Sequence, residues 1–250
     1  MVRVFCGMVL LLLVMINSNA QVKKERIAIS LKYETGRISN KNYSYTNGLD
    51  GKFLSDRKDI TVDFSYPVAS RIGMVSSIGI SIFDSEIKYQ NKDVLNYSGT
   101  DLSSVDLSLS QKIYWKVLDW NSCNNKNFGI SFYPYIGLKY YQTLKTVQGA
   151  NQFDNLNSQE AENWVNKYHL PAISADKNKS GGTLAFTPGL CLELSLLDRL
   201  GLFYDFAYIL GFIGNTKINV DYLYNHQIYS ESYKSNKCYI QHSFGLKYYF

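Results

Sequence analysis

The strongest constraint on the fold is an alternation of apolar and polar residues with a period of two. Between Leu184 and Leu196 every even position is apolar and every odd position is small or polar. Successive side chains of a strand point to opposite faces, so this pattern predicts a strand with one apolar and one polar face. A strand from 184 to 196 is long for a soluble protein and suits a tilted bilayer crossing, at about 3.3 Å per residue.

Seven further segments repeat this alternation, which gives eight predicted strands. They are residues 27–34, 60–66, 78–83, 105–110, 130–140, 202–208 and 243–250. The 21 Tyr and 13 Phe residues favour strands and membrane interfaces. After residue 20 no apolar stretch is long enough for a membrane helix. The sequence therefore predicts an all-β fold.

The connections between these strands alternate between long and short. Segments 40–58, 84–102, 142–182 and 212–236 are long and polar, 67–71 and 197–201 are tight, and 117–127 is intermediate. Outer-membrane barrels combine short periplasmic turns with longer extracellular loops. The pattern predicts a transmembrane antiparallel up-and-down β-barrel of eight strands. The alternative is ten strands, because 142–182 or 212–236 could hold a hairpin. Alternation from Ile218 to Tyr224 predicts an extension of the seventh strand.

The first twenty residues have the features of a signal peptide. Arg3 precedes an apolar run from Met8 to Ile16, and small residues end at Ala20, which predicts a mature chain of residues 21–250. The mature charge excess is small and dispersed, so nucleic acid is not an expected partner. Cys123, Cys191 and Cys238 remain, an odd number in dissimilar contexts without metal-ligand spacing, and we predict no structural role for them.

The last seven residues carry a motif with a known counterpart. In Phe244-Gly-Leu-Lys-Tyr-Tyr-Phe250, apolar residues alternate and an aromatic residue ends the chain. This motif resembles the terminal β-signal of outer-membrane barrels, which the barrel-assembly machinery reads. With the Tyr-rich segment 133–140, the mature chain resembles the small OmpX/OmpW-like outer-membrane β-barrel family. The resemblance implies the cell outer membrane of a Gram-negative envelope, lipid contact, and an assembly role for Phe244, Leu246, Tyr248 and Phe250. It implies no activity.

A barrel whose apolar face meets lipid must hold its polar residues inside. The predicted interior set is Lys32, Glu34, Asp63, Asp106, Lys139, Glu193, Asp205, Gln241 and Lys247. An eight-stranded barrel is just wide enough for its side chains to fill it, and buried charges must pair. We therefore predict a filled interior; a narrow passive, porin-like channel is the alternative. Pro134 and Pro188 fall inside strands and predict bulges, with both rings toward lipid.

Candidate catalytic residues are scarce, and no cofactor or metal site is predicted. The histidines are His169, His226 and His242. His242 and Ser243 are adjacent on a strand and point to opposite faces, so they cannot form a nucleophile–base pair directly. The sequence favours a non-enzymatic protein with a structural, binding or assembly role. A lipid A-modifying enzyme is the third hypothesis.

One short helix is predicted in the longest loop. Asn157 is the predicted N-cap with Glu160 three residues on, an apolar stripe follows, and Pro171 ends the segment. The stripe is Ala161, Trp164, Val165 and Tyr168. It predicts either packing on the barrel mouth or a docking face of Trp164, Val165 and Tyr168 for a protein partner or the outer leaflet.

Overall fold

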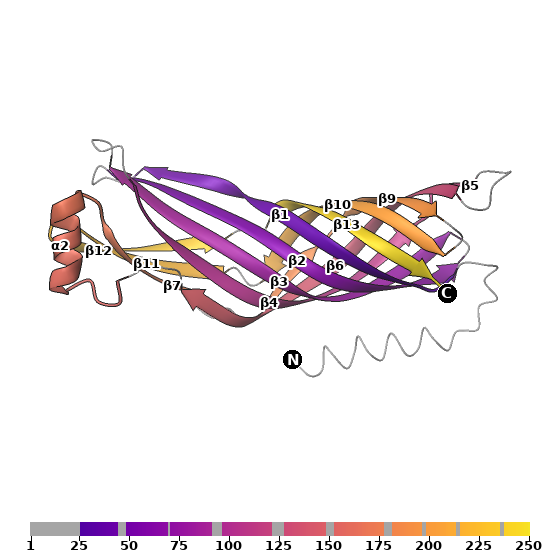
Figure 1. The fold of residues 1–250 in the computed structure, drawn as a ribbon, viewed down its shortest axis with the longest axis horizontal. Coiled ribbons are helices and arrows are strands. Elements are labelled where there is room, and N and C mark those ends of the chain that lie inside the picture. The colour runs from indigo at the N-terminus through magenta and orange to yellow at the C-terminus, as the bar shows by residue number, and fades with distance from the viewer. Residues whose placement is uncertain are drawn as a thin grey trace.

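Eight strand positions close into an antiparallel ring (Figure 1). The computed structural model describes residues 26–44, 49–69, 71–91, 97–121, 128–148, 153–177, 182–196, 199–213, 216–235 and 238–250. The ring contains β1 (Ala28–Ser44), β2 (Leu49–Ala69), β3 (Ile72–Asn91), β4 (Tyr97–Trp115), β6 (Phe128–Gln148), β8 (Thr183–Phe186) with β9 (Gly189–Leu196), β10 (Leu200–Ile213) and β13 (Cys238–Tyr249). The last of these, β13, pairs with both β10 and β1, which confirms the predicted eight-stranded barrel. The predicted signal peptide and Cys123 lie outside the described residues.

Strands β8 and β9 share one position in the ring and are separated at Thr187-Pro188. The Thr187 N–H donates to Gly137 O at 2.8 Å, and Pro188 O accepts from Tyr208 N–H at 2.9 Å. The register against β6 is the same on both sides of this break, and it also passes Pro134 without a shift. The predicted bulges at both prolines are therefore wrong. Each proline removes one donor but inserts no extra residue, so the ladder continues in register.

The outer surface of the barrel carries a belt of exposed apolar side chains. Members of this belt include Leu31, Ile60, Ile78, Ile80, Leu138, Leu190, Leu192, Leu202 and Leu246. The alternate residues of the same strands are polar and buried inside the ring. A continuous apolar belt around a polar interior is stable in hydrocarbon and would be unfavourable in water. In the described part of the chain, no helix has the length and apolarity to cross a bilayer.

Most strands run beyond the apolar belt and are longer than predicted. Both β2 and β6 span 21 residues. The ends of β1 and β2 occupy much of the predicted loop 40–58, and the ends of β3 and β4 occupy much of the predicted loop 84–102. In β2 above the belt, Ser55 and Arg57 point inward, whereas Asp56 and Lys58 point outward. Because both faces are polar there, the contrast that reveals a strand in the sequence is lost.

The connections at the C-terminal end of the barrel are short. Tight turns join β2 to β3 and β9 to β10, as predicted. The intermediate connection contains β5 (Leu118–Asn121), which pairs with β6 from Gly129 to Phe132. The polypeptide between β4 and β6 is thus partly an extension of the sheet.

A separate folded unit lies at the end of the barrel farthest from the C-terminus (Figure 1). Here β7 (Ala172–Lys177), β11 (Thr216–Tyr224) and β12 (Gln227–Ser235) form a three-stranded sheet, and α2 (Gln159–Tyr168) packs on β7 and β11. We call residues 153–177 and 216–235 the cap. Segment 212–236 does hold a hairpin, but the hairpin pairs with β7 instead of joining the ring. The ten-stranded alternative and the predicted extension of the seventh strand are therefore wrong.

Local signals define the ends of the cap elements. Asn225 and His226 both have positive φ, 51° and 60°, which is the two-residue turn geometry that matches strand twist. The N-cap of α2 is Ser158, whose Oγ accepts from Ala161 N–H at 3.2 Å. The predicted N-cap, Asn157, is off by one residue, because it is the side chain of Ser158 that accepts from the first turn of the helix. The helix ends at Tyr168 with His169 in the left-handed conformation, two residues before Pro171.

Gly79 marks a close approach of β2 and β3, and its replacement is a first test of the barrel. A Cβ atom at residue 79 would lie 2.4 Å from Ile60 O and 2.4 Å from Thr61 Cγ2. We expect Gly79→Ala to lower the free energy of unfolding by about 1–3 kcal/mol, because backbone must move. The urea midpoint of the refolded protein in micelles measures this loss. Gly201→Ala is the control, since its nearest neighbours are side-chain atoms at 3.2 Å or more; equal losses would contradict the assignment.

Candidate functional site

The interior of the barrel is a dense set of charged and aromatic side chains. All eight charged residues predicted for the interior lie there, and Gln241 is buried with them. The structure adds Arg57, Asp59 and Lys112, which are also buried. These three were missed because they lie just outside the segments with clear alternation, although they have the same inward parity as Asp63 and Ser110.

Lys139 forms a crossbar through the middle of the lumen. This residue is on β6, which lies directly across the ring from β1. Its ammonium group pairs with Glu34 on β1 and with Asp59 on β2 at 2.7 Å, and it donates to Gln241 Oε1 on β13 at 3.3 Å. Lys32 bonds the same Glu34 at 2.8 Å and Asp63 at 3.1 Å. One cation therefore joins four strands across the lumen.

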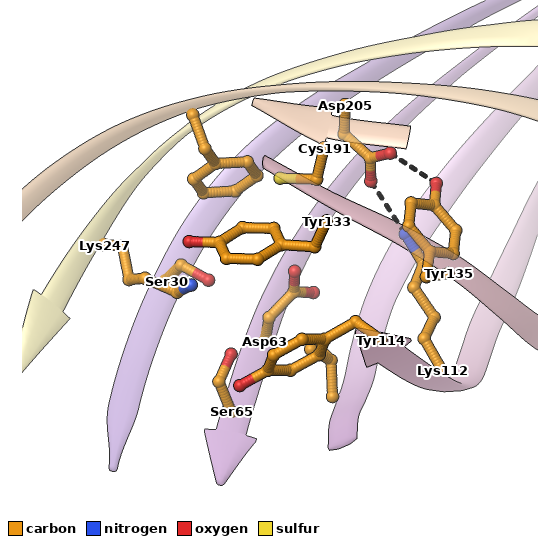
Figure 2. Close-up of a pocket in the computed structure, with 12 residues that line it drawn as sticks. Ser30, Asp63, Ser65, Lys112, Tyr114, Tyr133, Tyr135, Cys191, Asp205 and Lys247 are labelled. Carbon is orange, nitrogen blue, oxygen red and sulfur yellow. Dashed lines mark hydrogen bonds and ion pairs between the residues drawn. The ribbon is translucent and has the colours of Figure 1, made fainter. Parts of the chain in front are cut away.

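A second level of ion pairs lies nearer the C-terminal end (Figure 2). Lys112 on β4 pairs with Asp205 on β10 at 2.8 Å, and Lys247 on β13 pairs with Glu193 on β9 at 2.8 Å. Tyr135 and Tyr133 donate their hydroxyls to Asp205 and Glu193, respectively. Lys112 also lies 4.2 Å from the ring centroid of Tyr135. Each carboxylate here is thus bonded by both an ammonium group and a phenol.

Arg57 closes the interior on the other side of the crossbar. Its guanidinium pairs with Asp106 and lies over the ring of Tyr141 at 3.7 Å and of Phe83 at 5.4 Å. The hydroxyl groups of Tyr141 and Tyr239 are 2.7 Å apart. These contacts connect β2, β3, β4, β6 and β13. The lumen is therefore crossed by ion pairs at two levels and, at a third, by the contact of Arg57 with the Tyr141 ring on the opposite side.

A small cavity remains beside the ion pairs of the second level, and Figure 2 shows the residues that line it. It has a volume of about 50 Å³ and is lined by Ser30, Asp63, Ser65, Val75, Lys112, Tyr114, Tyr133, Tyr135, Cys191, Phe203, Asp205 and Lys247. A volume of this size holds a few water molecules. It is too small for a sugar or a lipid chain.

Other candidate chemistry is not assembled in the described residues. Ser243 is fully buried in the interior, whereas His242 Nδ1 bonds Tyr204 OH at 2.6 Å on the outer side. Cys191 and Cys238 are both free thiols. Within the described ranges, His, Cys, Asp and Glu side chains form no group of three or more that could hold a metal ion.

Charged residues mark where the barrel wall leaves the apolar belt. Arg37 and Asp56 face each other on the outer surface at 3.9 Å, and Lys88 bonds Glu86 at 2.7 Å. Asp101 lies directly across the sheet from Glu86. Partial burial, together with the Glu86 carboxylate, raises the pKa of Asp101 above its usual value. This end of the wall is therefore suited to water.

The cap has an apolar core that it shares with the extended barrel wall. Val220, Tyr222 and Leu223 of β11 pack with Ile87, Tyr89 and Leu102 of β3 and β4. Val165 of α2 is 8 % exposed and belongs to this core. Trp164 is partly buried against it, whereas Tyr168 is 41 % exposed. The predicted docking face is therefore divided, with Val165 turned inward and Tyr168 outward.

The terminal motif lies on the strand that closes the ring. Phe244, Leu246 and Tyr248 are exposed on the outer face of β13, between β1 and β10, and Phe250, which directly follows this strand, is exposed as well. Tyr248 and Phe250 are in edge-to-face contact with ring centroids 5.2 Å apart.

The closed ring, the apolar belt and the charge-paired interior together define the architecture of a membrane-spanning outer-membrane β-barrel. In agreement with this class, the fold is similar to the outer membrane protein OprG from Pseudomonas aeruginosa, with a TM-score of 0.55 and 11 % identity over 93 % of this chain and 99 % of that one. The protease OmpT from Escherichia coli aligns with a TM-score of 0.40 and 10 % identity over 93 % and 99 % of the two chains. The attachment invasion locus protein Ail of Yersinia pestis aligns at 0.34 and 10 %, over 91 % and 100 %. Only the first superposes closely enough to indicate a shared fold. No protein-family model and no curated protein sequence matches the chain.

Proposed function

We propose that this chain is a non-enzymatic protein of the outer membrane that presents its cap to a protein partner outside the cell. The observation that carries the proposal is the folded cap at the far end of the barrel, which has its own sheet and helix and packs on the extended barrel wall through a shared apolar core (Figure 1). A cap with a core holds its surface in one conformation, and such preorganisation favours binding. The barrel then acts as the membrane anchor, inserted by the barrel-assembly machinery through its terminal motif.

The outer side of α2 offers the most suitable contact surface. Trp164 and Tyr168 are in ring contact at 4.6 Å, and Lys167 lies 5.0 Å from the Tyr168 centroid. Of the two rings only that of Tyr168 is exposed, and tyrosine is enriched among binding hot spots. The helix lies at the tip of the molecule, remote from the apolar belt (Figure 1). This position favours a partner that approaches from solution over contact with the outer leaflet.

The filled lumen supports an anchor better than a solute channel. Lys139 and Lys112 each pair with a carboxylate across the lumen, and Arg57 reaches across it to the ring of Tyr141. Passage of a sugar would require at least one buried pair to separate, which is expensive for uncompensated charges. We therefore expect proteoliposomes to exclude sugars.

Site-specific photo-crosslinking on intact cells tests the proposed binding role. A benzophenone amino acid at Tyr168 should give a protein adduct, and Tyr168→Ala should weaken binding of that protein by about 2 kcal/mol if the side chain is a hot spot. The matched control places the same probe at Leu138, which is exposed on the apolar belt and should react with lipid. No protein adduct from residue 168, or the same adduct from residue 138, would refute the proposal.

A further inference from the structure

A groove of about 630 Å³ lies on the outer surface of the barrel, on the wall that β13 forms with its neighbours β1 and β10. Two neighbouring rows of outward side chains contribute to its lining. The row nearer the cap contains Tyr33, Phe244 and Tyr204, and the row below it contains Leu31, Leu246 and Leu202. A volume of about 300–1,000 Å³ with an apolar lining is usual for a site that holds one small ligand. This groove therefore has the size and the surface of a binding site.

The next row toward the cap is polar. Here Thr35 of β1 is paired with Lys58 on β2 and with His242 on β13, and Arg37 follows two residues further along β1. We call these four residues the polar rim. Directly paired side chains begin about 5 Å apart and diagonal ones about 7–8 Å apart, so one anion above Thr35 can contact the whole rim. The rim thus places hydrogen-bond donors at the end of the groove that is nearer the cap.

Three side chains of the polar rim keep donors for a ligand. Lys58 is exposed and has no ion-pair partner among the described residues. His242 Nδ1 lies 2.6 Å from the hydroxyl of Tyr204, and when this phenol donates, the imidazole carries its proton on Nε2. Arg37 faces Asp56 at 3.9 Å, but both side chains are more than half exposed, so this pair is weak and leaves guanidinium donors free. The rim is therefore suited to an anion.

We propose that the groove and the polar rim together bind one phosphorylated lipid of the outer leaflet, with an acyl chain in the groove and the phosphate over Thr35. The groove lies within the apolar belt, so an amphiphile of the membrane is the ligand that can reach it. The longer connections of outer-membrane barrels are extracellular, which puts the rim at the depth of the outer-leaflet headgroups. Ammonium and guanidinium groups form charge-assisted hydrogen bonds with phosphate oxygens. This inference does not depend on the proposed binding role of the cap.

Native mass spectrometry of the refolded protein, released from micelles that contain diphosphoryl lipid A, tests the proposal. One lipid should stay bound to the wild-type barrel, and the same lipid without its phosphates should bind at least about tenfold more weakly, the effect of losing one charge-assisted hydrogen bond. Lys58→Gln should weaken the binding of lipid A by the same factor, and Lys58→Arg should restore it. Lys88→Gln is the matched control, because Lys88 lies on the outer side of β3, bonded to Glu86 and away from the groove.

A second pair of variants tests the groove itself. Leu202→Trp fills part of the groove and should weaken the binding of lipid A several-fold, whereas Leu138→Trp, on the apolar belt outside the groove, should not. The heat-modifiable gel mobility of each variant shows whether its barrel is folded. An excess of inorganic phosphate should not displace the lipid, and displacement would show a site for the anion alone. Equal losses in Lys58→Gln and Lys88→Gln, equal binding of the phosphate-free lipid, or equal effects of the two tryptophan variants would also overturn the proposal.

Discussion

Replacement of Lys139 by methionine is expected to lower the free energy of unfolding by about 3–5 kcal/mol, the cost of leaving a buried charge without its partner. Among the described residues, the change removes the only ammonium group bonded to Asp59 and one of the two bonded to Glu34. Methionine has a similar volume, so the packing term is small and the loss is mainly electrostatic. Equilibrium unfolding of the refolded barrel in urea, followed by tryptophan fluorescence, measures the difference.

Two further variants separate this effect from a general loss of charge. Lys139→Met/Asp59→Asn should recover much of the stability, because the amide does not need a counter-ion. Lys88→Met removes a cation from a half-exposed pair with Glu86, and exposed pairs contribute about 1 kcal/mol or less. If Lys139→Met and Lys88→Met have equal effects, the crossbar does not hold the barrel together.

The ring of eight strands could be predicted because two physical requirements coincide in the sequence. A strand alternates its side chains, and a bilayer requires one face to be apolar, so Leu190 and Leu192 alternate with Cys191 and Glu193. Above the belt the strands have left the bilayer, so their outer face no longer needs to be apolar. Asp56 and Arg57 then look alike in the sequence although one faces water and the other the lumen. Strand ends and interior residues in this region could not be predicted from alternation.

The cap could be predicted only in part, because the strands that pair within it are distant from each other in sequence. The helix was found from its local spacing, and its N-cap was displaced by one residue because Asn157 and Ser158 are both suitable caps. The pairing of β11 with β7 joins residues 216–224 to residues 172–177, with no local signal for it. Asn225-His226 between two alternating segments is the local sign of the hairpin, because Asn and His tolerate the positive φ of a two-residue turn better than most residues.

The sequence also could not show which buried polar atoms of the inner face lack a hydrogen-bond partner. Serine at positions 77, 81 and 108 predicts only a polar inner face, and small polar residues are common in strands of this kind. What distinguishes them is the absence of partners, which depends on where Lys139 and Arg57 point after folding. Tertiary geometry therefore decides which of the inward hydroxyl groups are satisfied and which are not.

Replacement of Tyr222 by alanine is expected to open the cap while the barrel stays folded. The ring is fully buried, 4.9 Å from Tyr89 on the barrel wall and stacked on Tyr229 at 5.2 Å, and its hydroxyl donates to Glu231 at 3.1 Å. Loss of a buried aromatic side chain costs about 3–5 kcal/mol. Because a small unit has only a few kcal/mol of its own stability, this loss is enough to unfold the cap locally.

Hydrogen exchange measured by mass spectrometry reports the amide protection of the cap and of the barrel separately. Amides of β7, β11 and β12 should lose protection in Tyr222→Ala, whereas those of β1, β2 and β13 should keep it, and the urea midpoint of the barrel should not change. Tyr229→Ala is the control, because Tyr229 is partly exposed and its truncation should loosen the cap less. The protein adduct formed from residue 168 should also be lost in Tyr222→Ala. Retained protection in the cap, or lost protection in the barrel, would show that the two are not separate cooperative units.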